Sequence, residues 1–164
     1  MTIKDWIESV SRSGMVCTDY MRRLSFVENR EDVFRVLCDA NGGQWLFDIH
    51  AKGAVALPTE EFMREFKAYV NGGKVMEYPQ GYSSKFYCRY KGDVVADTTL
   101  VYMMECNGVQ VTVPENAYPS VILSRCSSAS FAMMPGARLN IEVYGDAEYS
   151  VSGDMSRVRI TKNG

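Results

Sequence analysis

The chain has 164 residues, of which 46% are hydrophobic, and its formal net charge at pH 7 is −2. This apolar share is typical of a globular protein, and the length fits one ordinary domain, so folding needs neither disulfides nor a metal. The near-neutral charge argues against a general nucleic-acid binder, and no apolar run is long enough to span a membrane.

The N-terminal part, residues 1–73, predicts a cluster of short helices. Apolar residues recur at helical spacing in segments around 2–11, 18–28, 31–37, 43–52 and 59–70. Asn29 is expected to break or cap the chain before the third segment. Asn71-Gly72-Gly73 is expected to end the last one.

After Gly73 the hydrophobic period changes from helical to two, which predicts a β-rich part over 74–164 and an α+β chain overall. Strand centres recur about every ten residues, which either an antiparallel sandwich or a β-solenoid produces. Two-residue hairpin signals are rare, and an Ala-x-x-x-Val-x-Gly cadence occurs within 137–153, so we favour the solenoid. The helical part could then cap its first open strand edge.

The cysteines indicate free thiols in a reducing, intracellular compartment, because they are odd in number, widely spaced and never in a Cys-x-x-Cys pair. The first residues carry charges where a secretion signal has an apolar core. We expect two or more of the thiols to be small buried apolar groups. The cysteines are Cys17, Cys38, Cys88, Cys106 and Cys126.

A set of sequence blocks lies between residues 30 and 113: Gly42-Gly43, Leu57-Pro58, Tyr69-Val70-Asn71-Gly72, Gly81-Tyr82-Ser83-Ser84, Gly92-Asp93 and Ala96-Asp97-Thr98-Thr99, among others. These blocks resemble an uncharacterised protein family of gut Bacteroidales and their phages or prophages. The resemblance implies a phage or mobile-element origin, and a place in the cytoplasm of a bacterial host cell or in a virion. It implies no activity, because none is known for the family.

Enzyme chemistry has little support in the sequence, and we expect a non-enzymatic protein without a cofactor. His50 is the only histidine, so a zinc site or a Cys–His nucleophile would need partners from distant segments. Asp93 and Asp97 are four residues apart and would share one face of a strand, where they could hold a divalent cation or act as an acid–base pair. The interpretation we favour makes Asp93 a turn residue and Asp97 a strand end.

The segment 82–91 offers a candidate ligand surface. On a strand, Lys85, Tyr87 and Arg89 share a face, with Tyr82 nearby. An aromatic ring flanked by cations can stack a base and hold a phosphate. The alternative is an ordinary solvated face with Phe86, Cys88 and Tyr90 buried behind it.

Two functions follow as hypotheses. The first is a phage-associated binding or assembly protein without catalysis, either virion-associated or host-interfering, that forms a homo-oligomer or binds a phage or host protein. The second is a small-molecule or nucleotide-sequestering protein that uses Tyr82, Lys85, Tyr87 and Arg89.

Overall fold

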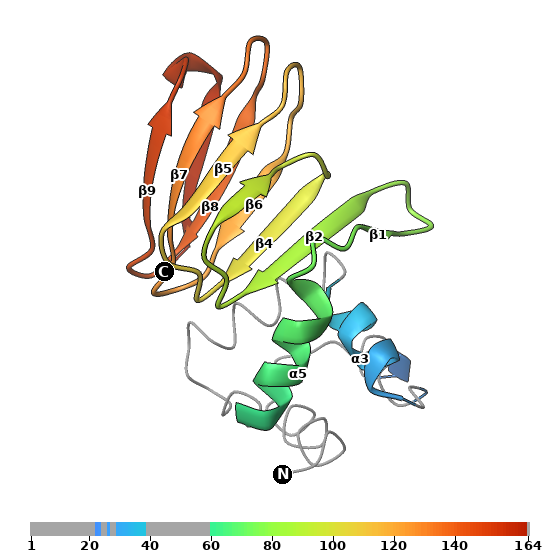
Figure 1. The fold of residues 1–164 in the computed structure, drawn as a ribbon. Helices are drawn as coiled ribbons and strands as arrows, with labels where there is room; N and C mark the ends of the chain where they lie inside the picture. The colour runs from blue at the N-terminus through green and yellow to red at the C-terminus, as the bar shows by residue number, and fades with distance from the viewer. Residues whose placement is uncertain (1–21, 24–25, 27–28, 39–59, 164) are drawn as a thin grey trace.

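The computed structural model describes residues 22–23, 26, 29–38 and 60–163. It contains two short N-terminal helices followed by a β-solenoid of about four turns in residues 84–163 (Figure 1). The segments expected to be helical around 2–11, 18–28 and 43–52 lie wholly or mostly outside the described residues. Within the described part, no helix has the length and apolar content needed to cross a membrane.

The two helices begin and end where the sequence indicates. Helix α3 (Arg30–Leu37) is capped by the Asn29 side chain, which accepts a hydrogen bond from the Asp32 backbone N–H at 2.9 Å. Helix α5 (Glu60–Val70) is followed directly by Asn71-Gly72-Gly73, where Gly73 takes a φ of +71°. The predicted cap and the predicted stop are both confirmed.

The strands form two sheets, and each coil of the solenoid contributes one strand to each sheet. Sheet A has the order β1-β2-β4-β6-β8-β10, and sheet B has the order β3-β5-β7-β9. All neighbours are parallel except β1, which pairs antiparallel with β2. The strands of sheet A are β1 (Met76–Glu77), β2 (Ser83–Cys88), β4 (Leu100–Met104), β6 (Ser120–Leu123), β8 (Leu139–Tyr144) and β10 (Val158–Asn163). Those of sheet B are β3 (Asp93–Val95), β5 (Val109–Val113), β7 (Ser128–Met133) and β9 (Glu148–Ser152).

The register explains the spacing seen in the sequence. Leu100 pairs with Ser120, and Ser120 pairs with Asn140, so one coil takes 20 residues. The first coil is shorter, because Ser84 pairs with Leu100. A strand centre about every ten residues therefore marks sheet A and sheet B in turn. The solenoid, and not the antiparallel sandwich, is the fold.

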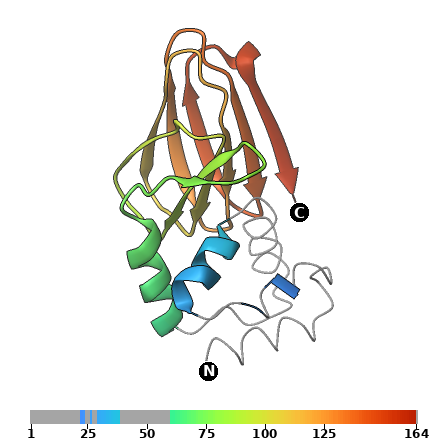
Figure 2. The same cartoon turned by 90° about the vertical axis from the view of Figure 1, so that its right-hand side faces the viewer.

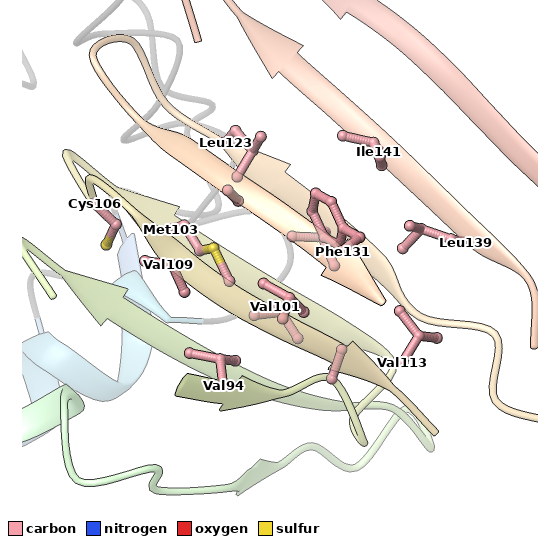
Figure 3. Close-up of a cluster of buried hydrophobic side chains, with 14 of the residues drawn as sticks. Val94, Val101, Met103, Cys106, Val109, Val113, Leu123, Phe131, Leu139 and Ile141 are labelled. Carbon is pink, nitrogen blue, oxygen red and sulfur yellow. The ribbon is translucent and has the colours of Figure 1, made fainter. Parts of the chain in front are cut away.

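The interior of the solenoid is an apolar layer between the two sheets (Figure 3). Val101, Met103 and Leu139 point inward from sheet A, while Val111 and Phe131 point inward from sheet B, and all are buried. On sheet B the outward side chains of β5 are exposed, which is the alternation expected of a sheet with one solvated face.

Strands β2 and β4 of sheet A are buried on both faces, because the helices pack on the outer side of this part of the sheet. Phe66 of α5 meets Phe86 of β2 edge-on, with the ring centroids 5.0 Å apart. Phe86 in turn stacks on Tyr102 of β4 at 5.4 Å. Figure 1 shows α5 and α3 gathered against the β2 end of the solenoid. This second core explains why β2 and β4 are almost wholly apolar runs.

Strand β1 and the side chain of Asn71 cover the first edge of sheet A. Strand β1 pairs with Ser83 and Ser84 at the start of β2. At the other end of β2, the Asn71 side-chain amide donates to the Cys88 carbonyl at 2.7 Å and accepts from the Cys88 N–H at 2.8 Å. The helical part therefore covers a face of the solenoid, and a strand and one side chain close the edge.

Candidate functional site

Lys85 and Tyr87 lie inside the solenoid, not on its surface. Their exposed fractions are 8% and 4%, and they sit in register with the inward-facing Val101 and Met103. The expectation of a ligand-facing or solvated row on β2 is therefore wrong for these two side chains. The physical reason is that α5 covers the other face, so both faces of the strand are buried.

The Lys85 ammonium is held by partners inside the first coil. It forms an ion pair with the Asp97 carboxylate and donates to the Val95 carbonyl at 3.3 Å. The Tyr87 ring packs against Tyr90 at 5.1 Å, and burial raises the pKa of its hydroxyl. Both side chains complete the core of the short first coil.

Arg89 lies at a corner of the solenoid and links it to α5. Its backbone has a φ of 50°, in the left-handed region. Its guanidinium binds Glu105 of the next coil and Glu60 of α5, each at 2.8 Å. The hydrogen bond from Arg89 lowers the pKa of Glu60, and the two carboxylates raise the pKa of Arg89. This geometry is that of a structural clamp.

Tyr82 lies at the start of β2, in a separate aromatic group. Its ring stacks on Tyr78 at 4.7 Å, and the guanidinium of Arg35 sits 5.9 Å from the centre of the Tyr78 ring. The four residues of the predicted ligand surface are therefore distributed among a turn, the interior and a corner. They do not form one surface.

Asp93 and Asp97 have different surroundings. Asp93 is exposed at the first residue of β3, whereas Asp97 follows that strand and pairs with Lys85. In the described ranges, no three His, Cys, Asp or Glu side chains are grouped so that they could hold a metal ion. His50 and Cys17 lie outside those ranges.

Three of the described cysteines are buried, as expected of small apolar groups: Cys38, Cys88 and Cys106. Burial raises the pKa of Cys88 to about 12 and that of Cys106 to about 11. Both therefore remain thiols at neutral pH, which is the unreactive form of the side chain. Cys126, at a corner between coils, is exposed.

The C-terminal end of the solenoid is the candidate functional surface. Within the part of the chain that the structure describes, β10 pairs only with β8, and β9 pairs only with β7. Figure 2 shows β10 as the last strand of the stack, near the C-terminus. Each strand therefore presents one row of backbone N–H and C=O groups without a strand partner.

The side chains of this last layer are only partly covered. Tyr149, Val151, Val158 and Ile160 pack on the interior core from one side. One coil earlier, their register partners Ala129, Phe131, Leu139 and Ile141 are buried. The regular strand spacing after Gly73 extends over this segment, but a repeat pattern alone does not say which coil is the last.

No protein-family model, no curated protein and no solved structure matches the chain.

Proposed function

We propose that the chain is a non-enzymatic binding or assembly protein whose working surface is the C-terminal end of the solenoid. The observation that carries this proposal is the difference between the two edges of sheet A. The first edge is closed by β1 and Asn71, whereas β10 at the last edge has no further strand partner among the described residues. In sheet B, β3 and β9 are both edge strands. Open edges of parallel strands are templates for pairing with another chain.

The partner that suits this end is a second copy of the chain. Because the first edge of sheet A is closed, copies cannot stack head to tail on that sheet. Two C-terminal ends can meet about a two-fold axis, with β10 of one copy antiparallel to β9 of the other. This arrangement closes on itself as a dimer.

Side-chain alternation fits this pairing. Val158 and Ile160 face inward, as do Tyr149 and Val151, so the half-covered apolar side chains of the two copies continue one core. On the outer face, Arg159 of β10 and Glu148 of β9 are exposed and of opposite charge. An antiparallel pair brings them to the same side of the sheet.

The test is the solution mass of the full-length chain, measured by light scattering over a range of concentrations. The expected result is a dimer. Ile160→Lys, which sets a charge in the shared core, should give a monomer, and the milder Tyr149→Ser should weaken the dimer. Val95→Lys is the matched control, because Val95 is 47% exposed on β3, at the opposite edge of sheet B.

Two results would overturn the dimer. One is a monomeric wild-type chain at every concentration, and the other is an oligomer that Ile160→Lys and Tyr149→Ser leave intact. Circular dichroism spectra show whether each variant keeps its strands.

The biological setting we propose is a phage or a related mobile element. The support is the resemblance of residues 30–113 to proteins of gut Bacteroidales and their phages. A virion component and a host-interfering protein in the bacterial cytoplasm are both consistent with a pairing surface. Mass spectrometry of purified virions, compared with infected-cell extract, separates the two. Absence of the chain from both samples would contradict the phage setting.

A further inference from the structure

Three arginines and a tyrosine line a hollow at the solenoid corner where β5 passes to β6, β7 to β8 and β9 to β10. The hollow measures about 440 Å³, within the range of small-molecule sites, and is lined by Tyr118, Arg138, Ser156, Arg157 and Arg159, among others. In Figure 1 these connections lie at the opposite end of the strands from α3 and α5.

The repeat places these side chains in a column. Tyr118 and Arg138 stand two residues before Ser120 and Asn140, which pair in register. Arg157 stands one residue before Val158, which pairs with Leu139, so it lies level with Arg138. Neighbouring strands are about 4.8 Å apart. One aromatic ring and two guanidiniums therefore occupy equivalent positions in three successive coils, and Arg159 follows on β10.

These groups are available to a ligand. Tyr118 has an exposed fraction of 62%. Arg138 and Arg159 are exposed and make no ion pair within the described residues. Arg157 lies 3.8 Å from Asp154, whose carboxylate also accepts hydrogen bonds from Ser156. The lining of the hollow holds three guanidiniums and no carboxylate, so positive charge is concentrated here on a chain whose net charge is −2.

We propose that this hollow binds a nucleotide. Guanidiniums hold phosphate oxygens by paired, charge-assisted hydrogen bonds. The Tyr118 ring, next to Arg138 in the column, is placed to stack the base. A long polyanion is less suited, because an overall negative chain repels it outside this one corner. Arg159 belongs to β10 and would lie in the proposed dimer interface, but the inference does not depend on it, since Tyr118, Arg138 and Arg157 lie outside β9 and β10.

The experiment is isothermal titration calorimetry of the full-length chain with ATP, ribose 5-phosphate and adenosine, without magnesium. ATP should bind most tightly, because it alone offers both several phosphates and a base. The double variant R138A/R157A should lose about tenfold or more in affinity for ATP and for ribose 5-phosphate. Tyr118→Ala should lower the affinity for ATP about tenfold and leave the affinity for ribose 5-phosphate unchanged.

Arg64→Ala is the control, since it removes an exposed arginine of the same charge from α5. It should leave the affinity for ATP unchanged. Three outcomes would overturn the site: no heat of binding with ATP, an equal loss of affinity in R64A, or a ribose 5-phosphate affinity equal to that of ATP. Tighter binding of a decathymidylate, lost in R138A/R157A, would also overturn it in favour of single-stranded nucleic acid. If the chain is monomeric and still binds ATP, the proposed dimer is wrong and the proposed nucleotide site stands.

Discussion

The side-chain amide of Asn71 pairs with both backbone groups of Cys88, at 2.7 and 2.8 Å, as a neighbouring strand would. Asn71 also stands directly after α5, where its backbone N–H closes the last turn onto Lys67 at 3.0 Å. One residue therefore ends the helix and pairs with both backbone groups of the last residue of β2. This joins the helical part to the first coil through hydrogen bonds as well as through apolar packing.

Asn71→Ala should destabilise the protein by about 1–3 kcal/mol, because it leaves the N–H and C=O of Cys88 without their partner at a half-buried position. Asn71→Asp keeps the acceptor but loses the donor, and sets a carboxylate oxygen against the Cys88 carbonyl, so it should cost more. Urea unfolding measures both. Asn107→Ala, at an exposed turn residue, is the control. Equal stability of N71A and N107A would contradict the edge-closing role.

The Lys85–Asp97 pair should respond unequally to loss of its two partners. Asp97→Ala leaves a buried ammonium with the Val95 carbonyl, and should cost about 2–3 kcal/mol. Lys85→Met replaces the ammonium by an apolar group and leaves the half-exposed carboxylate to water, so the change should stay within about 1 kcal/mol. Chemical unfolding of the two variants checks the order. A larger cost for K85M than for D97A would be inconsistent with burial of the lysine.

Three glycines test the cost of backbone strain. Gly136 has a φ of +74° and Gly81 a φ of +87°, whereas Gly72 lies outside the left-handed region. A Cβ on Gly136 would also meet Asn116 Oδ1, but this atom ends an exposed side chain that can turn away. Replacement by alanine should therefore cost about 1–2 kcal/mol at Gly81 and at Gly136, and little at Gly72. Thermal unfolding ranks them, and a cost at Gly72 as large as at Gly81 would contradict the role of strain.

Alkaline pH should destabilise the fold through its buried thiols. Burial raises the pKa of Cys88 to about 12 and that of Cys106 to about 11, above the ordinary value of 9.0 that applies in the unfolded chain. Below pH 9 both states keep their protons, and the stabilisation is complete. As pH rises above 9 the unfolded chain loses protons first, so the free energy of unfolding falls by about 1.4 kcal/mol per pH unit for each thiol, up to about pH 11 for Cys106 and about pH 12 for Cys88.

Urea unfolding at a series of pH values measures this slope. Cys88→Ala should reduce the slope of the unfolding free energy against pH by the contribution of one thiol. Cys126→Ala, which removes an exposed cysteine, should leave the slope unchanged. Stability that stays level well above the ordinary cysteine pKa would disprove the effect.

The architecture could be predicted because its signals are local. The change of period after Gly73, the Asn29 cap and the regular spacing of strands each depend on a few neighbouring residues, and all three match the structure. The spacing of residues in the sequence does not reveal the second core, which lies between the helices and sheet A. Phe86 and Tyr102 are buried by α5, a contact between distant segments, and so β2 has no solvated face.

The candidate sites show the same division. Lys85 and Tyr87 alternate with apolar residues, which is the pattern of a half-exposed strand, yet the ion pair with Asp97 allows a lysine in the interior. Conversely, no local sequence pattern relates Tyr118, Arg138 and Arg157, because they are far apart along the chain. Their separations of 20 and 19 residues match the register steps from β6 to β8 and from β8 to β10, so they become neighbours once the repeat is known.

The 20-residue coil makes the solenoid a one-dimensional stack, in which each coil pairs only with the coil before it and the coil after it. The covered first coil is then a template on which later coils add in order, through contacts that are close in sequence, so the chain can fold as it leaves the ribosome. The same geometry sets a rule for changes in length. Duplicating a whole coil preserves both sheets, whereas inserting half a coil would move every later strand to the opposite sheet.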